Sequence, residues 1–342
     1  MLLPENDSGL LDAVRHAKHN EPESHISTLA RMVWQAVASD NGAEKYKSAC
    51  GVTNKDLPLV RSLNELFASS SASNKICLPE YHCLEAQEII SRHCHQIKHE
   101  PSSILVIRHL LEHARDLDSF LSGVWHMIGQ DGLCLIEVPD STSLIMKGDL
   151  SQLWEEHTAY LTPSTFQRLL QNHGFELIFY QAMASDGEDL CIGLIRRNGS
   201  KEKCLSNEPA SIHADDFIAR FPLLLNSIVL ALQAAQHDRL IYVFGANHIA
   251  GTFLDLLAGD VDLIEAILDD DAEKDGCTLG LSSKSIKLAN KIGAEQPLEI
   301  LVAVNEGRYP NLYHRLRQRF PSSKGHRVES LVKFFVNAWE VT

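Results

Sequence analysis

The stretch that decides the fold class is ILVIRHLLEHARDLDSFLSGVWHMIGQDGLCLIEVP, residues 104–139. The segments 104–110 and 132–139 are continuous apolar runs of strand length, which is typical of strands buried on both faces. Between them, residues 117–128 carry apolar side chains at helical spacing. A buried strand, an amphipathic helix and a second buried strand predict an α/β protein with a Rossmann-like sheet.

The pattern continues toward the carboxyl terminus. A helix is expected from Thr162 to about Asn172, because threonine caps a helix well and Pro163 suits its first turn. Strands are expected at 175–181 and 189–197, close enough in sequence to form an antiparallel pair. Upstream, residues 1–75 are the least organised part, with a short helical stretch around 26–38 and a serine-rich loop at 68–74.

A second α/β unit follows a polar connector at residues 198–211. It starts with a long amphipathic helix at 215–236, and the strands and helices that we expect after it are 240–246, 248–258, 262–271, 298–304 and 309–319. The predicted domains are therefore a divergent segment at 1–75, a sheet domain at 76–200, a connector with the long helix at 201–238 and a smaller Rossmann-like domain at 239–342.

Charge and composition exclude several classes of function. The 342 residues carry a net charge of −14, which argues against nucleic acid and anionic membranes as partners. The longest nearly apolar run, 221–235, is too short and too polar to span a bilayer, and the first residues do not resemble a signal peptide. Eight scattered cysteines without a CxxC pair favour reduced thiols and a cytoplasmic location.

Histidines and carboxylates gather between residues 109 and 157. His109 ends the first buried strand, Glu137 ends the next, and Glu156 and His157 follow in a loop. Ligands of open parallel sheets bind outside the carboxyl ends of the strands, so these groups are candidates for moving protons at neutral pH. The alternative is that they are only caps and loop contacts.

Several motifs in a fixed order resemble the S-adenosyl-L-methionine-dependent C-methyltransferases of deoxysugar and polysaccharide biosynthesis. RHLLEH (108–113), IEVPD (136–140) and WEEHTAYLTPSTFQRLL (154–170) match the strand ends and the loop of that family. Residues 242–257, 267–276 and 298–305 resemble its C-terminal Rossmann-like domain. The resemblance covers roughly residues 80–320 and is more specific than any single motif.

The resemblance implies a class I methyltransferase-like fold, S-adenosyl-L-methionine as cofactor and methylation of a carbon next to a carbonyl. The acceptor would be a nucleotide-linked keto sugar or a similar small molecule. His157, paired with Glu156, matches the catalytic base, and His109 would polarise the carbonyl or orient the substrate. Trp154 stands where the family has a tyrosine, so the donor for the developing oxyanion stays open, with Tyr160 as one candidate.

The cofactor end departs from the family. Class I methyltransferases hold the cofactor on a glycine-rich turn after the first strand, yet no G-x-G occurs before residue 75. An altered version at residues 2–14 would make Asn6, Asp7 and Gly9 the cofactor-binding residues. The family's zinc domain with paired CxxC motifs has no counterpart. A binding or partner protein that has lost the cofactor turn, and with it catalysis, is therefore the alternative function.

Two further patterns bear on ligand binding. Gly245, Asn247 and His248 follow a strand and open a helix, with Asp269 after the next strand, which resembles a dinucleotide site and makes an NAD-dependent oxidoreductase the third alternative. Because Asn247 replaces the middle glycine, a packing turn or a contact to the acceptor substrate is expected there instead. The run HCHQIKH (93–99) places two histidines four residues apart but offers no third ligand, so no metal site is predicted.

Overall fold

The structure is a computed structural model that describes residues 23–40, 45–67, 74–97, 103–183, 189–198, 212–281, 283–293, 295–307 and 309–342. The chain divides into two compact units, each built on its own sheet. The first unit comprises Met1–Asp140 and Glu156–Glu208, and the second comprises Ser141–Glu155 and Pro209–Thr342.

The first sheet has the strand order β1-β2-β3-β5-β4. Its strands are β1 (Ser48–Gly51), β2 (Ser103–Arg108), β3 (Leu133–Pro139), β4 (Phe175–Met183) and β5 (Leu190–Arg197). β1, β2 and β3 are parallel neighbours, whereas β5 runs antiparallel to both β3 and β4. The predicted α/β class is confirmed, and a parallel sheet that ends in an antiparallel pair is the arrangement expected of a class I methyltransferase-like domain.

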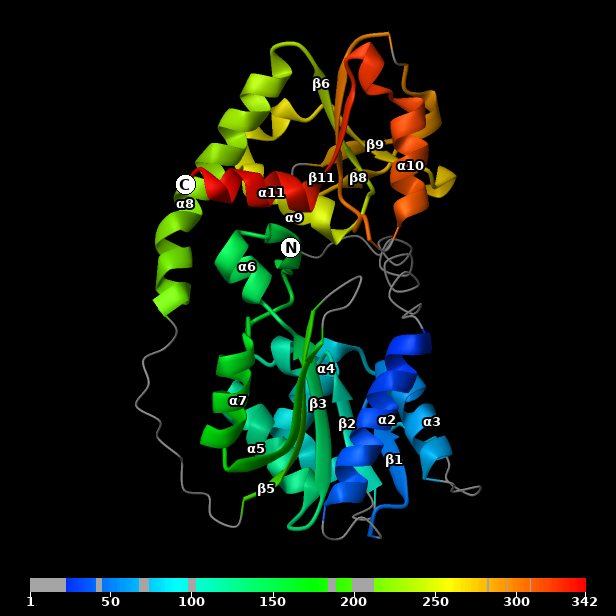
Figure 1. The fold of residues 1–342 in the computed structure, drawn as a ribbon, viewed down its shortest axis with the longest axis vertical. Helices are drawn as coiled ribbons and strands as arrows, with labels where there is room; N and C mark the ends of the chain where they lie inside the picture. The colour runs from blue at the N-terminus through cyan, green and yellow to red at the C-terminus, as the bar shows by residue number, and fades with distance from the viewer. Residues whose placement is uncertain are drawn as a thin grey trace. The chain divides into compact units, whose positions relative to one another are not determined.

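Helices cover both faces of this sheet (Figure 1). Leu105 and Ile107 of β2 face α4 (Cys83–His93), α5 (Leu117–Ile128) and α7 (Pro163–Asn172). Ile104 and Val106 face α2 (Glu23–Ser39) and α3 (Leu57–Leu66). Successive side chains of a strand point to opposite faces, so two apolar layers need the continuous apolar run that the sequence has here.

The N-terminal part of the chain is more ordered than the sequence suggested. Apart from the helical stretch around 26–38, which is confirmed, the expectation for residues 1–75 was wrong over 45–67, where β1, a short 3-10 turn (Asn54–Asp56) and α3 form. β1 has the sequence SACG, whose residues are poor strand formers. Its hydrogen bonds to β2, with Cys50 opposite Leu105, form the strand in spite of that composition.

The second sheet has the order β11-β10-β6-β7-β9-β8, and only β8 pairs antiparallel. Its strands are β6 (Leu240–Phe244), β7 (Ala266–Asp269), β8 (Thr278–Leu279), β9 (Lys284–Leu288), β10 (Leu298–Val302) and β11 (Arg327–Ser330). Its helices are α8 (Ile212–Gln236), α9 (His248–Leu257), α10 (Pro310–Arg319) and α11 (Leu331–Glu340). The predicted Rossmann-like character of this region is thus observed.

The segment Ser141–Glu155, with α6 (Thr142–Lys147), belongs to the second unit, although the sequence-based division placed it at 76–200. Leu144 and Leu150 are buried, and the indole of Trp154 stacks on the His248 ring with 3.3 Å between centroids. Contacts of this kind join residues about a hundred positions apart, which local sequence patterns do not reveal.

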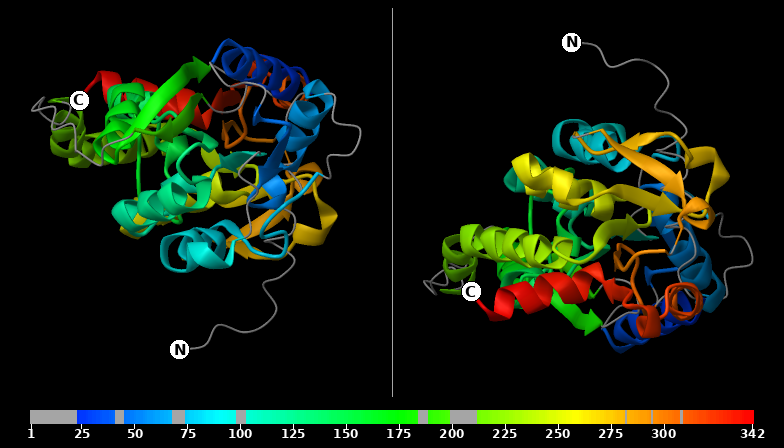
Figure 2. Two further views of the ribbon diagram at one scale, coloured as in Figure 1. Left: turned by 90° about the horizontal axis from the view of Figure 1, so that it is seen from below. Right: turned by 90° about the horizontal axis from the view of Figure 1, so that it is seen from above.

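Helix α8 lies beside α11 within the second unit (Figure 2). The Arg220 guanidinium lies 3.7 Å from the centroid of the Trp339 ring and donates a hydrogen bond to the Trp339 carbonyl. By length and composition alone, Ala214–Gln236 could cross a membrane, and one such helix is weak evidence for a membrane span. Leu224, Ile228 and Leu232 of this helix are buried.

Candidate functional site

The carboxyl ends of β1, β2 and β3 carry a buried network of charged side chains. Arg108 at the end of β2 contacts Glu137 of β3 through its Nε at 2.8 Å and its Nη2 at 2.7 Å, with both side chains at most 2% exposed. The two residues face each other in the strand register. Burial alone would raise the pKa of Glu137, but the guanidinium and the neighbouring His109 outweigh it and lower this pKa to about 2.

His109 lies between two carboxylates. Its Nδ1 is 3.5 Å from Glu112 Oε1 and its Nε2 is 3.3 Å from Glu137 Oε1. Burial disfavours the charged ring, but the two carboxylates dominate and raise the pKa of His109 to about 9. The residue has a φ of 52°, in the left-handed region that costs a non-glycine residue energy. A protonated ring with both nitrogens directed at carboxylates is placed to hold the network together.

The loop that contains Glu156 and His157 is fixed to the turn after β2. The Thr158 amide donates to the Glu112 carbonyl at 2.8 Å, and the Thr158 hydroxyl donates to the Ala114 carbonyl at 2.7 Å. These bonds bring the His157 ring to 4.8 Å from the His113 ring, edge to face. The motifs RHLLEH and WEEHTAY, separated by some forty residues in sequence, therefore meet at one edge of the sheet.

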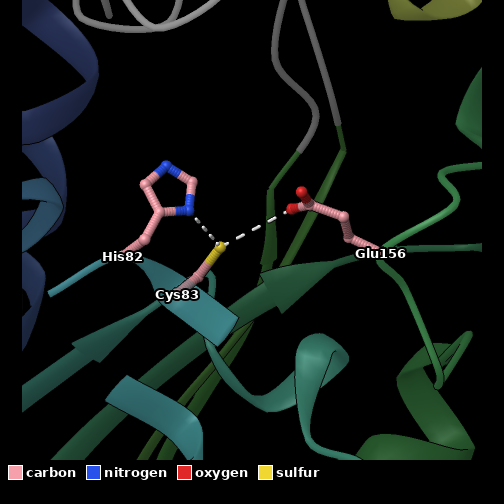
Figure 3. A group of neighbouring side chains, drawn as sticks. All are labelled: His82, Cys83 and Glu156. Atoms are coloured by element: carbon pink, nitrogen blue, oxygen red, sulfur yellow. Dashed lines mark hydrogen bonds between the residues drawn. The ribbon is translucent and has the colours of Figure 1, made fainter. Parts of the chain in front are cut away.

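Glu156 also lies near the start of α4, where sequence reasoning identified nothing (Figure 3). Cys83 Sγ is 3.3 Å from His82 Nδ1 and 3.8 Å from Glu156 Oε2. Burial raises the pKa of the Cys83 thiol. No spacing signal could have revealed this group, because Glu156 follows Cys83 by 73 positions.

The turn from β1 to α3 is the second feature that the sequence did not reveal. Gly51 ends the strand, and the buried carboxylate of Asp56 accepts the amide hydrogens of Val52 and Thr53, each at 2.8 Å. The other Asp56 oxygen accepts the Arg108 amide at 2.9 Å. Burial raises the pKa of Asp56 to about 6, against these amides and the Arg108 charge. A strand, a turn and a helix of the kind predicted at residues 2–14 thus exist at 48–66, while Asn6, Asp7 and Gly9 lie outside the described residues.

Several buried acceptor atoms at this edge receive no hydrogen bond from the protein. They are the Thr53 hydroxyl oxygen, Oε2 of Glu112 and Oε2 of Glu137; Glu112 Oε1 also lacks a short hydrogen bond but faces the charged His109 ring at 3.5 Å. Burial alone would raise the pKa of Glu112, but the adjacent histidines outweigh it and lower this pKa to about 2. The Glu112 carboxylate is therefore ionised. Buried polar atoms are nearly always bonded in folded proteins, so a set of unbonded acceptors indicates a site for a ligand that donates hydrogen bonds or carries positive charge.

The corresponding turn of the second sheet is bonded to its own chain. Asp269 accepts the Ala246 amide at 2.8 Å and contacts Lys274 Nζ at 3.0 Å. The Asn247 side chain caps α9 at the Ala250 amide and donates to the Ala303 carbonyl at 2.8 Å. A dinucleotide would need the Asp269 carboxylate for its ribose, and here Ala246 and Lys274 occupy it. The expected acceptor contact by Gly245, Asn247 and His248 stays a prediction.

The helix expected to pair two histidines of HCHQIKH ends earlier than required. α4 ends at His93, and His95 lies in the following 3-10 turn (Cys94–Gln96), where its ring contacts that of His93. His99 lies outside the described residues.

Comparisons with known proteins add little to this picture. No family model matches the chain, and no curated protein matches it. Among solved structures, a mitomycin 7-O-methyltransferase is 16% identical over 49% of this chain and 53% of its own, with a TM-score of 0.31. Human N-acetylserotonin methyltransferase is 13% identical over 57% of this chain and 60% of its own, with a TM-score of 0.32.

A third structure, phosphoethanolamine N-methyltransferase 2 of Haemonchus contortus, is 10% identical over 91% of this chain and 63% of its own, with a TM-score of 0.30. The chain therefore spans between half and two thirds of the length of each of these structures. Likeness at this level carries no argument about the chain's activity, which has to be argued from the site itself.

Proposed function

We propose that the chain is an S-adenosyl-L-methionine-dependent methyltransferase that methylates a carbon next to a carbonyl in a small molecule. The observation that carries the proposal is the bonding of Thr158 to Glu112 and Ala114, because it brings His157 to the carboxyl edge of the parallel strands. A nucleotide-linked keto sugar as the acceptor is proposed on the sequence resemblance alone.

His157 is the proposed base. An imidazole can accept the proton of a carbon acidified by an adjacent carbonyl, and a nearby carboxylate stabilises the imidazolium that results. Glu112 supplies that carboxylate, since ligand atoms of Glu112, His113 and His157 lie within 4.8 Å of one another. His109 is proposed as a positioning residue rather than an electrophile, because both of its ring nitrogens already face carboxylates.

The residues at this edge fit S-adenosyl-L-methionine, whose ammonium, hydroxyl and sulfonium groups are donors or cations. The Thr53 hydroxyl and the Glu112 and Glu137 carboxylates offer unbonded acceptors for them. Glu80 is the proposed ribose ligand, since Cys77 and Leu78 just before it pair with Gly51 and Val52 alongside β1. When bound, this cofactor supplies an electrophilic methyl group. Because Asp56 already takes two amides of the turn, side chains must provide most of the contacts.

Two measurements with S-adenosylhomocysteine test the cofactor part of the proposal. Calorimetric titration gives its dissociation constant. In a thermal melt, S-adenosylhomocysteine at ~100 times that constant should add about 2.7 kcal/mol of stability, and NAD should add nothing. Glu80→Gln should weaken binding roughly tenfold, the effect of one lost hydrogen bond to a charged group. The exposed Glu65→Gln on α3 is the matched control and should bind normally. Stabilisation by NAD alone, or by neither compound, would reject the proposal.

The base is tested separately by solvent deuterium exchange into a nucleotide-linked keto sugar. The wild type should exchange the hydrogen next to the carbonyl, and His157→Ala should not, while keeping its affinity for S-adenosylhomocysteine. Undiminished exchange in the variant would remove His157 from this role.

A further inference from the structure

We propose that His82, Cys83 and Glu156 bind a zinc ion. Among the described residues, their ligand atoms form one of two groups of three that lie within 4.8 Å of one another. Tetrahedral zinc with ligands at about 2.0–2.3 Å needs ligand atoms separated by roughly 3.3–3.8 Å. Two of the three separations, 3.3 Å between Sγ and Nδ1 and 3.8 Å between Sγ and Oε2, already lie in that range, and the imidazole and carboxylate ligand atoms lie within 4.8 Å of each other.

The three side chains come from two segments that are fixed by other bonds (Figure 3). His82 precedes the first turn of α4, and its amide donates to the Glu85 carboxylate at 2.9 Å. The Glu156 carbonyl contacts His113 Nδ1 at 3.1 Å, which fixes the loop. Little rearrangement is therefore needed to bring the ligands around an ion.

The ligand types favour zinc over harder or softer ions. A thiolate, an imidazole and a carboxylate together suit a borderline cation, whereas magnesium and calcium prefer oxygen ligands. His113 Nδ1 bonds the Glu156 backbone carbonyl at 3.1 Å, which positions the residue, and lies 4.0 Å from Glu156 Oε2. Three protein ligands leave a fourth position for an oxygen ligand, which is the pattern of catalytic rather than structural zinc.

The second group, Glu112, His113 and His157, is the weaker candidate. It lacks a sulfur ligand, and the charged ring of His109 lies 3.5 Å from Glu112 Oε1. A divalent cation at Glu112 would be repelled by that imidazolium. The cation near Cys83 is Lys55, whose charge favours the thiolate form that zinc binds.

The proposed function gives the open position a use. In that reaction the carbonyl oxygen of the acceptor gains negative charge, and a Lewis acid next to His157 would stabilise it. This assignment rests on the proposed function, but zinc binding itself does not.

The experiment is a titration of the metal-free full chain with cobalt(II), followed by displacement with zinc and measurement of bound metal by mass spectrometry. One equivalent should bind, with the near-ultraviolet charge-transfer band of a cobalt–thiolate bond. Cys83→Ser should abolish that band, and His82→Ala or Glu156→Gln should weaken binding by tenfold or more. Cys94→Ser and Glu155→Gln are matched neighbours and should bind as the wild type does, and circular dichroism should show every variant folded.

Binding without the thiolate band, binding that survives Cys83→Ser, or no binding at all would overturn the proposal. Loss of binding only in Glu112→Gln and His157→Ala would assign the metal to the second group instead. The result is independent of the proposed function, because S-adenosylhomocysteine binding is measured separately. If zinc binds and S-adenosylhomocysteine does not, the methyltransferase is rejected and the metal site is kept. If S-adenosylhomocysteine binds and zinc does not, the metal site is rejected and the methyltransferase is kept.

Discussion

The carboxyl edges of the two sheets have similar local structure and different chemistry. Each has a glycine at the strand end, Gly51 as the last residue of β1 and Gly245 directly after β6, followed by a turn and a helix. In the second sheet, Asp269, Lys274 and Asn247 bond to the turn itself. In the first, buried charges are paired, but the Thr53 hydroxyl and Oε2 of both Glu112 and Glu137 receive no hydrogen bond from the described residues. The edge with the more recognisable glycine pattern is thus the self-bonded one, and the edge without it is the better ligand site.

The largest expected effect concerns the buried ion pair of the first edge. Arg108→Met should destabilise the protein by about 3–5 kcal/mol, because it leaves Glu137 charged, buried and deprived of its guanidinium. Urea unfolding followed by fluorescence measures the change. Arg92→Met is the control, since Arg92 pairs with Glu88 on the exposed face of α4 and its loss should cost less than about 1 kcal/mol. Equal effects of the two variants would contradict the view that the first edge is a buried charge network.

His109 and His326 should make the stability respond to pH in opposite directions. The pKa of His109 is raised from 6.5 to about 9, so its stabilising contribution is complete below pH 6.5 and is lost as the pH rises through 9. Burial lowers the pKa of His326, whose Nδ1 accepts the Leu298 amide at 3.1 Å, so its contribution is complete above pH 6.5 and is lost as the pH falls below that value. Each group changes the free energy of unfolding by up to ~1.4 kcal/mol per pH unit.

NMR titration of the histidine ring signals checks this prediction directly. The His109 signal should shift on the alkaline side and the His326 signal on the acid side of pH 6.5. His109→Asn should remove the alkaline loss of stability and leave the acid loss in place. A His109 signal that titrates below pH 6.5 would show that the carboxylates do not hold its proton.

Glycine at the first turn should be harder to replace than an ordinary glycine. A Cβ at Gly51 would lie 2.5 Å from the Asp56 Cβ, and Asp56 cannot move without breaking its three amide bonds. Gly51→Ala should therefore cost about 1–3 kcal/mol in urea unfolding. Gly259→Ala, whose Cβ would meet no atom within 4 Å, is the control and should be close to neutral. A neutral Gly51→Ala would mean that the turn is looser than its hydrogen bonds indicate.

The smallest effect is expected at the second turn. Asn247→Ala removes the cap of α9 and the bond to the Ala303 carbonyl, which should cost about 1 kcal/mol of stability. Asn247→Ser keeps a capping hydroxyl and should recover part of this loss. If Asn247 also contacts the acceptor, as the sequence predicted, the alanine variant will in addition raise the KM for that acceptor, and an unchanged KM would leave it only the capping role.

The sequence predicted most elements that have a strong pattern of their own. Helices α5 and α7 begin and end within a residue of the expected limits, because their apolar spacing and the capping threonine of α7 are local signals. β1 was missed because SACG has no strand pattern and depends on β2 for its hydrogen bonds. The same holds for the site: His109, Glu156 and His157 lie in recognisable motifs, whereas Asp56 and Cys83 gain their contacts to Arg108 and Glu156 only through the fold.

By itself, the sequence determined that the chain forms two α/β units and that histidines and carboxylates follow its buried strands, because hydrophobic periodicity and strand-end chemistry are local properties. Only the tertiary structure decided which of those groups pair with one another, which buried acceptor atoms lack a hydrogen-bond donor, and which three side chains lie close enough to bind one metal ion. Those outcomes depend on distances of a few ångströms between segments far apart in the chain, and on how burial changes the free energy of a charge there.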